Sequence, residues 1–354
     1  MKITFVTPFT AVSGGIRVIA IYARFFHERG HQVTVVSQPR RLPSRNLKYW
    51  VKWLIRKSQK SPKNIRQIDF DFLGINYRVL DKPRLVMAED IPDGDIVIAT
   101  WWETAEWVAR LPASKGQKAY LLQDYEIFSP MSPERTIATY GMGMKMIAVS
   151  NYIRDVIASN HGVKGIEVVP NSVDLDQFDA PPRAKNNPIR IGFLYTETER
   201  KNVRLAIDAV TEVKRRRPEL EIVAFGTRPP NEPLPDFIRF IANPSQNEIP
   251  GLYASCDVWL LTSDHEGFGL PILEAMACRT PVLSTRAGAA PELIDGTNGT
   301  LLPGESKAFA DEILRYAEMS PEEWHRRSDA AYESVRTYSW SMAADRFLEI
   351  LGAT

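Results

Sequence analysis

The chain has 354 residues, with 44 Lys and Arg, 43 Asp and Glu, a net charge of +1 and 44% hydrophobic residues. This length favours more than one domain, and the composition excludes a disordered or collagen-like protein. Cys256 and Cys278 are too few for a disulfide framework, which favours a reducing, cytoplasmic environment. No apolar run has the length of a membrane-spanning helix, and the first residues lack the layout of a signal peptide.

The first half of the sequence alternates short apolar runs with amphipathic stretches. Helices are predicted at 18–26 and about 153–159, because apolar residues recur there at helical spacing. Strands are predicted from the apolar runs at 3–6, 33–36, 95–99, 119–122, 146–149 and 166–169. This order is typical of a parallel α/β domain.

A polar stretch with three prolines, residues 179–188, is predicted to be an interdomain linker. A second alternation follows it, with a helix predicted at 203–213 and strands at 189–194, 220–225, 258–261 and 281–284. The sequence therefore predicts two doubly wound domains. Ligands bind at the carboxyl ends of strands in such sheets, and the two domains are expected to face each other across a central cleft.

Residues 265–274, His-Glu-Gly-Phe-Gly-Leu-Pro-Ile-Leu-Glu, follow one of these strands and carry the strongest chemical signal. The two glycines allow the backbone to approach a ligand, and Pro271 suits the first turn of a helix whose free N–H groups favour an anion. Beside such a site, Glu266 and Glu274 can accept hydrogen bonds from sugar hydroxyls. The alternative is a pair of solvated surface acids, which the glycine and proline context disfavours.

This segment resembles the E-x7-E signature of the retaining glycosyltransferases of family 4, which have the GT-B fold. The similarity extends over nearly the whole chain, through motifs in the family's order: Ser13-Gly14-Gly15, 169–174 (Val-Pro-Asn-Ser-Val-Asp), 291–294 (Pro-Glu-Leu-Ile), and Trp340 with 346–348. The resemblance implies an N-terminal acceptor-side domain, residues 1–182, and a nucleotide-sugar-binding domain, residues 183–338. A terminal helix, residues 339–354, is expected to cross back to the N-terminal domain.

The resemblance also assigns roles to residues. Arg200 and Lys201 stand where the family places the cations that neutralise the leaving diphosphate, a task that needs no metal. Glu266 is expected to contact sugar hydroxyls near the reacting carbon, which completes the predicted catalytic set. Donor binding is expected from the two glycine loops with their neighbours, from Gly226 beside the base, and from Glu274 as the ribose ligand. The predicted donor-binding residues are Gly14, Gly15, Gly226, Gly267, Phe268, Gly269, Leu270 and Glu274.

Two positions depart from the family pattern. Tyr195 stands near a place where the family often has an Arg, so Arg200 is expected to carry more of that role. The acceptor-side strand, which often ends in His-Asp, here ends in Gln123-Asp124. Gln123, Asp124 and Asn171 are the predicted acceptor-side residues, and 123–126 with 139–141 most resembles a branch that contains rhamnosyltransferases of polysaccharide assembly.

No metal site is expected. Three Asp-x-Asp triplets occur, at 69–71, 93–95 and 174–176, but none has the context of a metal site, and the five histidines share no ligand spacing. No Ser-His-Asp arrangement is found, and no cofactor is expected apart from the nucleotide sugar as substrate.

The net charge conceals an uneven distribution. Residues 29–68 contain eleven Lys and Arg and no acid, which leaves the rest of the chain at −10, that is +1 minus +11. Between residues 40 and 66 these cations alternate with tryptophans and aliphatic residues, as in an interfacial helix on an anionic membrane. A solvated segment of the N-terminal domain is the alternative, and nucleic acid is disfavoured because no binding fold accompanies the segment 38–66.

Together these features predict a metal-independent retaining glycosyltransferase. It is expected to move a sugar from a nucleoside-diphosphate sugar to a hydroxyl of a glycan or lipid-linked glycan, in the cytoplasm and at the inner face of a membrane. Two alternatives stay open: a nucleotide-sugar epimerase of the same fold, and a non-catalytic subunit that binds nucleotide sugar or membrane.

Overall fold

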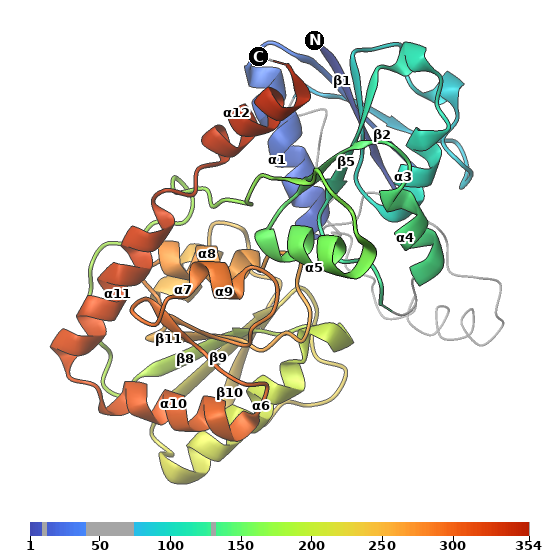
Figure 1. The fold of residues 1–354 in the computed structure, drawn as a ribbon. Coiled ribbons are helices and arrows are strands. Elements are labelled where there is room, and N and C mark those ends of the chain that lie inside the picture. Colours follow the sequence, from blue (N-terminus) through green and yellow to red (C-terminus); the bar gives the residue numbers. More distant parts are fainter. Residues whose placement is uncertain (9–12, 40–73, 129–131, 354) are drawn as a thin grey trace. The chain divides into compact units, whose positions relative to one another are not determined.

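The computed structural model describes residues 1–8, 13–39, 74–128 and 132–353, and the chain forms two compact units (Figure 1). The first comprises residues 1–148, 157–169 and 344–354, and the second comprises 149–156 and 170–343. Each is an α/β unit around one parallel sheet, as the sequence predicts.

Among the described residues, the sheet of the first unit has seven parallel strands in the order β3-β2-β1-β4-β5-β6-β7. The strands are β1 (Lys2–Thr7), β2 (Gln32–Ser37), β3 (Asn76–Val79), β4 (Ile96–Ala99), β5 (Gln117–Leu122), β6 (Lys145–Ala148) and β7 (Glu167–Val168). Its helices are α1 (Gly14–Glu28), α3 (Trp102–Ala109), α4 (Pro133–Tyr140), the end of α5 (Asn151–His161) and the end of α12 (Trp340–Leu351), with short 3-10 turns η1 (Ala88–Asp90) and η2 (Ala113–Lys115).

The C-terminal segment packs on α1 inside the first unit. The Phe347 ring meets the Tyr22 ring edge-on at 4.9 Å and the Phe26 ring at 5.5 Å, and Arg29 Nε donates to Asp345 Oδ1 at 2.5 Å. Burial raises the pKa of Tyr22 above its usual range. The last turns of the chain thus complete a core that begins with its first helix.

The described part of the second unit has a six-stranded parallel sheet in the order β10-β9-β8-β11-β12-β13. The strands are β8 (Arg190–Leu194), β9 (Glu221–Gly226), β10 (Ile238–Ala242), β11 (Val258–Leu261), β12 (Val282–Ser284) and β13 (Gly299–Leu301). Its turns and helices are η3 (Glu199–Lys201), α6 (Val203–Arg216), α7 (Ile249–Ala254), α8 (Leu270–Ala277), α9 (Ala290–Leu293), α10 (Ser306–Glu318) and α11 (Pro321–Val335).

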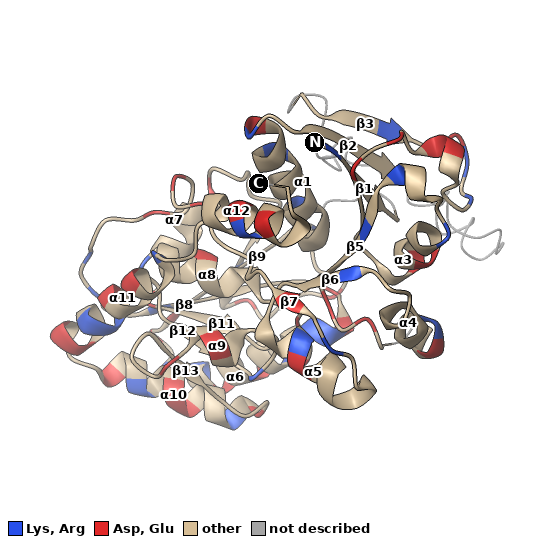
Figure 2. Cartoon of the chain, turned by 45° about the horizontal axis from the view of Figure 1, so that its top comes forward, with Lys and Arg blue, Asp and Glu red and all other residues tan. Residues whose placement is uncertain are grey.

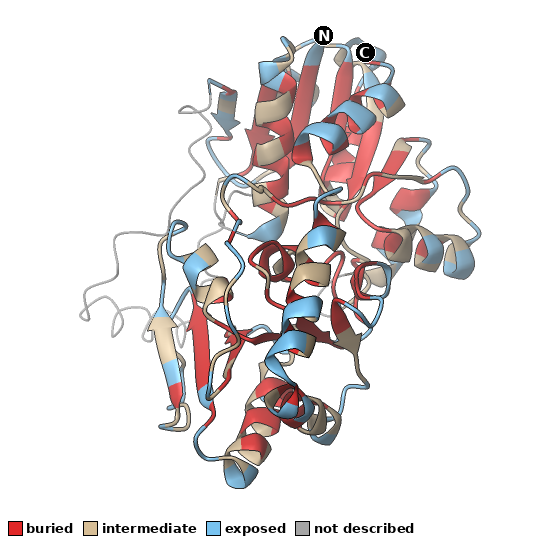
Figure 3. Ribbon diagram, turned by 90° about the vertical axis from the view of Figure 1, so that its left-hand side faces the viewer, coloured by how far each residue is buried: buried red, intermediate tan, exposed pale blue. Residues whose placement is uncertain are grey.

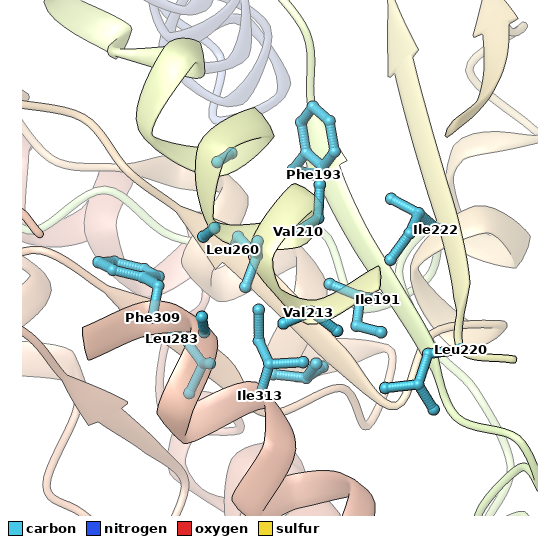
Figure 4. Packing of buried hydrophobic residues seen from close by; sticks show 14 of the residues in the cluster. Ile191, Phe193, Val210, Val213, Leu220, Ile222, Leu260, Leu283, Phe309 and Ile313 are labelled. Carbon is cyan, nitrogen blue, oxygen red and sulfur yellow. The ribbon is translucent and has the colours of Figure 1, made fainter. Parts of the chain in front are cut away.

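One hydrophobic cluster joins this sheet to α6 and α10 (Figure 4). Ile191 and Leu260 contribute from adjacent strands, Val213 from α6, and Phe309 and Ile313 from α10. Central strands such as β8 and β11 are buried on both faces, which explains their continuous apolar sequences, and Figure 3 shows the strands largely in the buried colour. The cluster fixes the strand ends that carry the loops described below.

The structure differs from the predicted elements mainly at sheet edges. The predicted strands are present as β1, β2, β4 to β9, β11 and β12, within one or two residues. The three helices predicted from apolar spacing are α1, α5 and α6, and the helices expected at Pro271 and at the end of the chain are α8 and α12. Sequence reasoning missed β3, β10 and β13. The edge strands β3 and β10 are partly exposed, so they lack a continuous apolar run.

The compact units divide the chain elsewhere than at 182/183 and 338/339, because the predicted linker packs on the second unit. Arg183 donates to the carbonyl oxygens of Ala254 and Cys256, and Arg279 Nε donates to the Ala180 carbonyl at 2.9 Å. Upstream of the linker, Val173 forms a bridge with Ser339. Residues 170–188 therefore belong to the fold of the second unit.

None of the helices in the described ranges is both long and apolar enough to cross a membrane. The basic segment 40–66 lies outside the described residues. Of the wider range 38–66, the structure describes only Gln38 and Pro39.

Candidate functional site

The strand order of the second sheet indicates where a ligand is expected to bind. From β8 the chain runs outward to β9 and β10 and then returns to place β11 on the other side of β8. Ligands in doubly wound sheets bind beyond the carboxyl ends of the strands where the order reverses. The loops after β8 and β11 occupy that position, and they contain the predicted catalytic residues Arg200, Lys201 and Glu266.

Lys201 and Glu266 form the centre of this site. Lys201 Nζ donates to Glu266 Oε1 at 2.5 Å, and Ser263 Oγ donates to the same oxygen at 2.7 Å. Glu266 is 6% exposed and Ser263 is 2% exposed. The fold thus joins two of the predicted catalytic residues and adds Ser263, which sequence reasoning missed because a single loop serine carries no distinctive signal.

The loop that carries the two cations is bonded to the loop after β11. The Arg200 carbonyl accepts from the Asp264 N–H at 2.9 Å, and Asn202 Nδ2 donates to Asp264 Oδ1 at 2.9 Å. Asn202 has a positive φ of 43° and caps α6 by accepting from the Leu205 N–H. The same cap that starts α6 therefore holds Arg200 and Lys201 beside the acidic loop.

The glycine loop before α8 is held through its backbone. Ser150 Oγ donates to the Gly267 carbonyl at 2.8 Å, and the Ala289 N–H donates to the Phe268 carbonyl at 3.0 Å. Gly269 caps α8 with a φ of 99°, which a residue with a side chain rarely adopts. The Phe268 side chain is buried, so a ligand would meet the backbone here. Leu270 begins α8, as the motif predicts.

A second glycine packs against the acidic residue of this loop. Gly288 has a φ of 57°, and a Cβ placed there would lie 2.6 Å from Glu266 Cβ and 3.0 Å from the Phe268 carbonyl oxygen. Only a glycine leaves room for Glu266 in this position. Sequence reasoning did not single out Gly288, because its contact lies 22 residues away along the chain.

Glu274 lies in the second turn of α8 and is 9% exposed. Its Oε2 accepts a hydrogen bond from the Tyr253 hydroxyl at 3.0 Å. Tyr253 is buried and packs edge-on against Trp259 of β11, with 4.5 Å between the ring centroids. The predicted ribose ligand is thus oriented by a tyrosine from α7.

Gly226 ends β9, and close packing at this position requires a residue without a side chain. A Cβ there would lie 2.6 Å from the Tyr195 carbonyl oxygen. Tyr195, which stands near the family's arginine position, turns its hydroxyl to Glu197 Oε1 at 2.6 Å. Burial, and then this hydrogen bond, raises the pKa of Tyr195 to about 12. Tyr195 is therefore a neutral, packed residue and supplies no positive charge at this edge.

The first unit has a corresponding arrangement at its own switch point, between β1 and β4. Gly14 and Gly15 open α1, whose cap Ser13 accepts from the Ile16 N–H. A Cβ on Gly15 would lie 3.4 Å from Gln123 Oε1, so the Gln123 amide lies close to Gly15. Within the described residues, Gln123 Oε1 accepts no hydrogen bond.

The predicted acceptor-side residues belong to different units. Gln123 and Asp124 follow β5 in the first unit, where Asp124 Oδ1 accepts from the Tyr125 N–H at 2.9 Å. Asn171 belongs to the second unit and is 4% exposed. The Asn171 N–H donates to the Val149 carbonyl at 3.4 Å.

A buried acid near Asp124 was part of the quoted motif 123–126, but sequence reasoning gave it no role of its own. Glu126 is 2% exposed, and its Oε2 accepts from the Trp102 N–H at the start of α3 at 2.9 Å. Burial raises the pKa of Tyr120 and Tyr140, and the nearby Glu126 charge raises both further. These contacts give Glu126 a structural role in fixing the loop after β5.

Two of the Asp-x-Asp triplets have other partners, and 69–71 lies outside the described residues. Asp93 accepts from Lys115 Nζ at 2.8 Å, which lowers the pKa of that carboxyl, and Asp95 accepts from the Lys2 N–H. Asp174 Oδ1 accepts from the Asp176 N–H. In the ranges that the structure describes, no group of three or more His, Cys, Asp or Glu could hold a metal ion.

Comparison with protein families matches both units. The model "Glycosyltransferase Family 4" matches residues 12–177, and the model "Glycosyl transferases group 1" matches residues 188–319. The chain belongs to glycosyltransferase family 4.

Curated relatives of this family 4 chain include several mannosyltransferases. It is 36% identical over 118 residues to the GDP-mannose-dependent alpha-(1-6)-phosphatidylinositol dimannoside mannosyltransferase of Mycobacterium tuberculosis, a match that covers 33% of the chain and 30% of that protein. It is 30% identical over 192 residues to the MMP alpha-(1->4)-mannosyltransferase of Mycolicibacterium hassiacum, covering 51% and 46%. The matches thus span between about a third and a half of these relatives' own length.

Solved structures confirm the GT-B fold expected for this family 4 chain. HepE from Anabaena, solved in complex with UDP, matches with a TM-score of 0.76 and 18% identity over 100% of both chains. TarM of S. aureus matches with a TM-score of 0.75 and 11% identity over 99% of both chains.

Proposed function

We propose that the chain transfers a sugar from a nucleoside-diphosphate sugar to a hydroxyl group of a glycan or lipid-linked glycan, with retention of the anomeric configuration. The observation that carries the proposal is the Lys201–Glu266 pair beside Arg200, at the switch point of the second sheet. Family membership supports the same reaction class, and a structural neighbour was solved with UDP.

The proposed chemistry uses these groups as fixed charges. The bond between the anomeric carbon and the phosphate oxygen breaks while the acceptor hydroxyl forms a new bond on the same face. The departing phosphate oxygen takes the acceptor proton. Arg200 and Lys201 stabilise the negative charge that develops on the diphosphate, without a metal ion. Glu266 holds donor sugar hydroxyls, and Glu274 holds the ribose.

Two glycine-rich segments complete the proposed donor site. Gly14 and Gly15 contact the diphosphate from the start of α1, where free N–H groups favour an anion. Gly267 and Gly269 do so at the start of α8, and Gly226 flanks the base. Gln123, Asp124 and Asn171 are proposed to contact the acceptor. The Gln123 segment also supports the branch of polysaccharide rhamnosyltransferases as the proposed subgroup.

The basic segment 40–66 supports a proposal for where the protein meets its acceptor. Cations interleaved with tryptophans favour the surface of an anionic membrane. We place the protein at the cytoplasmic face of a membrane, where it would meet a lipid-linked acceptor.

A binding screen followed by an assay tests the function. Thermal shifts with UDP, GDP, dTDP and ADP sugars identify the donor, because a ligand of the folded state raises the melting temperature. Transfer to glycan or lipid-linked acceptors is then measured with EDTA present, and NMR of the product gives the anomeric configuration. Product formation that requires added metal would refute metal independence, and inversion would refute retention.

Two controls separate the alternative functions. Conversion of the nucleotide sugar without any acceptor would indicate an epimerase of the same fold. Binding without conversion, with every acceptor class tested, would indicate a non-catalytic subunit. Glu274→Ala should abolish both donor binding and transfer while the far-UV circular dichroism spectrum stays that of the wild type.

A further inference from the structure

The first turn of α5 lies in the second unit although its sequence adjoins the sheet of the first. Residues 149–156 group with the second unit, whereas the rest of α5 groups with the first. The reason lies in the hydrogen bonds made by Ser150, which precedes the helix, and by the N–H groups of its first residues.

The Ser150 hydroxyl both accepts and donates a hydrogen bond. Ser150 Oγ accepts from the Ile153 N–H at 3.2 Å, which caps α5, and donates to the Gly267 carbonyl at 2.8 Å. Ser150 is fully buried, so water does not compete for either bond. One hydroxyl therefore ties the start of α5 to the glycine loop between Glu266 and α8.

A second residue of the same unit holds the same turn. The Glu292 carboxylate accepts from the Tyr152 N–H at 2.9 Å and from Asn151 Nδ2 at 2.7 Å. Glu292 lies in α9, whose preceding segment contains Gly288, packed on Glu266, and Ala289, which donates to the Phe268 carbonyl. Both the glycine loop and the loop that packs on it are thus anchored to α5.

The Ser150 bond has a direct effect on the orientation of the loop. The carbonyl of Gly267 and the N–H of Phe268 belong to one planar peptide unit and point in opposite directions. Fixing the carbonyl therefore fixes the N–H, in a segment whose two glycines would otherwise rotate freely. Glu266 precedes this peptide unit by a single residue, Gly267.

We infer that Ser150 is a positioning residue for the donor site, which orients the segment from Glu266 to Gly269 through the Gly267 carbonyl. Its effect on the reaction rests on the proposed function. Its effect on the order of the loop does not, so the two can be measured separately.

The experiment compares Ser150→Ala with Ser150→Thr, which keeps a hydroxyl, and with Ser320→Ala as a matched control. Ser320 caps α11 by accepting from the Glu323 N–H at 3.1 Å, so its loss removes a helix cap remote in sequence from the glycine loop. Ser150→Gly provides a second hydroxyl-free variant if Ser150→Ala does not fold, because glycine is a tolerated cap.

Amide hydrogen exchange of residues 264–270 is the first measurement, and donor KM and kcat are the second. We expect exchange in this segment to rise at least tenfold in Ser150→Ala, with kcat/KM reduced at least tenfold. Ser150→Thr should restore both, and Ser320→Ala should change neither.

Unchanged exchange at 264–270 in a folded Ser150→Ala or Ser150→Gly protein would overturn the inference. So would faster exchange without any change in kcat/KM, because the loop would then not serve the donor. Absence of transfer in the wild type would instead refute the proposed function and leave the exchange result as the test of loop anchoring.

Discussion

Glu266 accepts two hydrogen bonds at a single carboxylate oxygen. Lys201 and Ser263 both donate to Oε1, and no described residue donates to Oε2. A sugar hydroxyl could therefore bond to Oε2 without displacing either partner. The Lys201 ammonium, in contrast, would be shared, because a bound diphosphate would compete with Glu266 for it. Lys201 would therefore contact the phosphate part of the proposed donor, and its partner Glu266 the sugar part.

Replacing Lys201 tests this arrangement at the residue scale. Lys201→Ala should lower kcat/KM by about 100-fold or more, as removal of a preorganised donor to a developing anion does elsewhere. Steady-state kinetics with a saturating acceptor measure the effect. Lys307→Ala, which removes an exposed lysine paired with Asp311, is the control and should leave kcat/KM within about twofold. Wild-type kinetics in Lys201→Ala would refute the site.

At the residue scale, sequence reasoning singled out residues that stand in a motif and missed residues that act singly. Lys201 and Glu266 stand in the loops after β8 and β11, and Glu274 ends the motif that runs from Glu266 into α8. Ser263 and Tyr253 were missed, because one serine in a loop and one apolar-flanked tyrosine resemble ordinary surface and core residues. Their functions depend on partners that only the fold brings near.

At the scale of elements, the loop before α9 determines the space available to the acidic loop. Gly288→Ala would place a Cβ 2.6 Å from that of Glu266 in addition to straining a positive φ. Gly143→Ala is a matched control, since Gly143 has a φ of 72° but nothing within 4 Å. Both should lose about 1–2 kcal/mol of stability from backbone strain. Only Gly288→Ala should also lower kcat/KM, by tenfold or more; equal kinetics in the two variants would contradict the packing argument.

The segment predicted to be a linker is anchored by one buried acid. Asp257 is fully buried and accepts from Arg183 Nη1 at 2.9 Å, from the Asn186 N–H at 3.0 Å and from the Arg190 N–H at 2.7 Å. A proline-rich polar sequence is typical of a linker, but its hydrogen bonds to Asp257 make it part of the second unit.

Removing this acid should be costly, because it leaves two backbone donors without their acceptor and takes the carboxylate partner from the half-buried Arg183. We expect Asp257→Ala to lower the free energy of unfolding by about 3–5 kcal/mol in urea titrations. Asp311→Ala, which breaks exposed pairs with Arg216 and Lys307, should cost less than about 1 kcal/mol. A loss below about 1 kcal/mol in Asp257→Ala would show that the segment is held by other contacts.

At the scale of the whole molecule, the charges of the described residues are mixed. Figure 2 shows positions of acidic and basic residues together on α10 and α11. Several of these residues form ion pairs, such as Lys307 with Asp311 and Arg315 with Glu312. The acid-free segment contrasts with this pattern, because only Arg29 of its eleven cations lies in a described range, and Arg29 pairs with Asp345.

Liposome flotation tests the proposed membrane role of the segment. Neutralising four of its cations, Lys48, Lys52, Arg56 and Lys57, by substitution with Gln should weaken binding to anionic vesicles by tenfold or more, since each contributes roughly 1 kcal/mol. The control carries four Gln substitutions at exposed, locally paired cations: Arg204, Arg215, Lys307 and Arg336. Equal binding to neutral and anionic vesicles, or equal loss in both variants, would refute the proposal.

The sequence by itself determined the α/β class, most strands, and the loops that are proposed to carry the chemistry, because apolar periodicity and the placing of glycine and proline are local properties. Edge strands such as β3 and β10 escaped it, since partial exposure removes the local signal. Only the tertiary structure decided which residues meet. Ser150 lies 117 residues from Gly267, and Lys201 lies 65 residues from Glu266. Such pairs follow from the order of strands in a sheet, which no local pattern encodes.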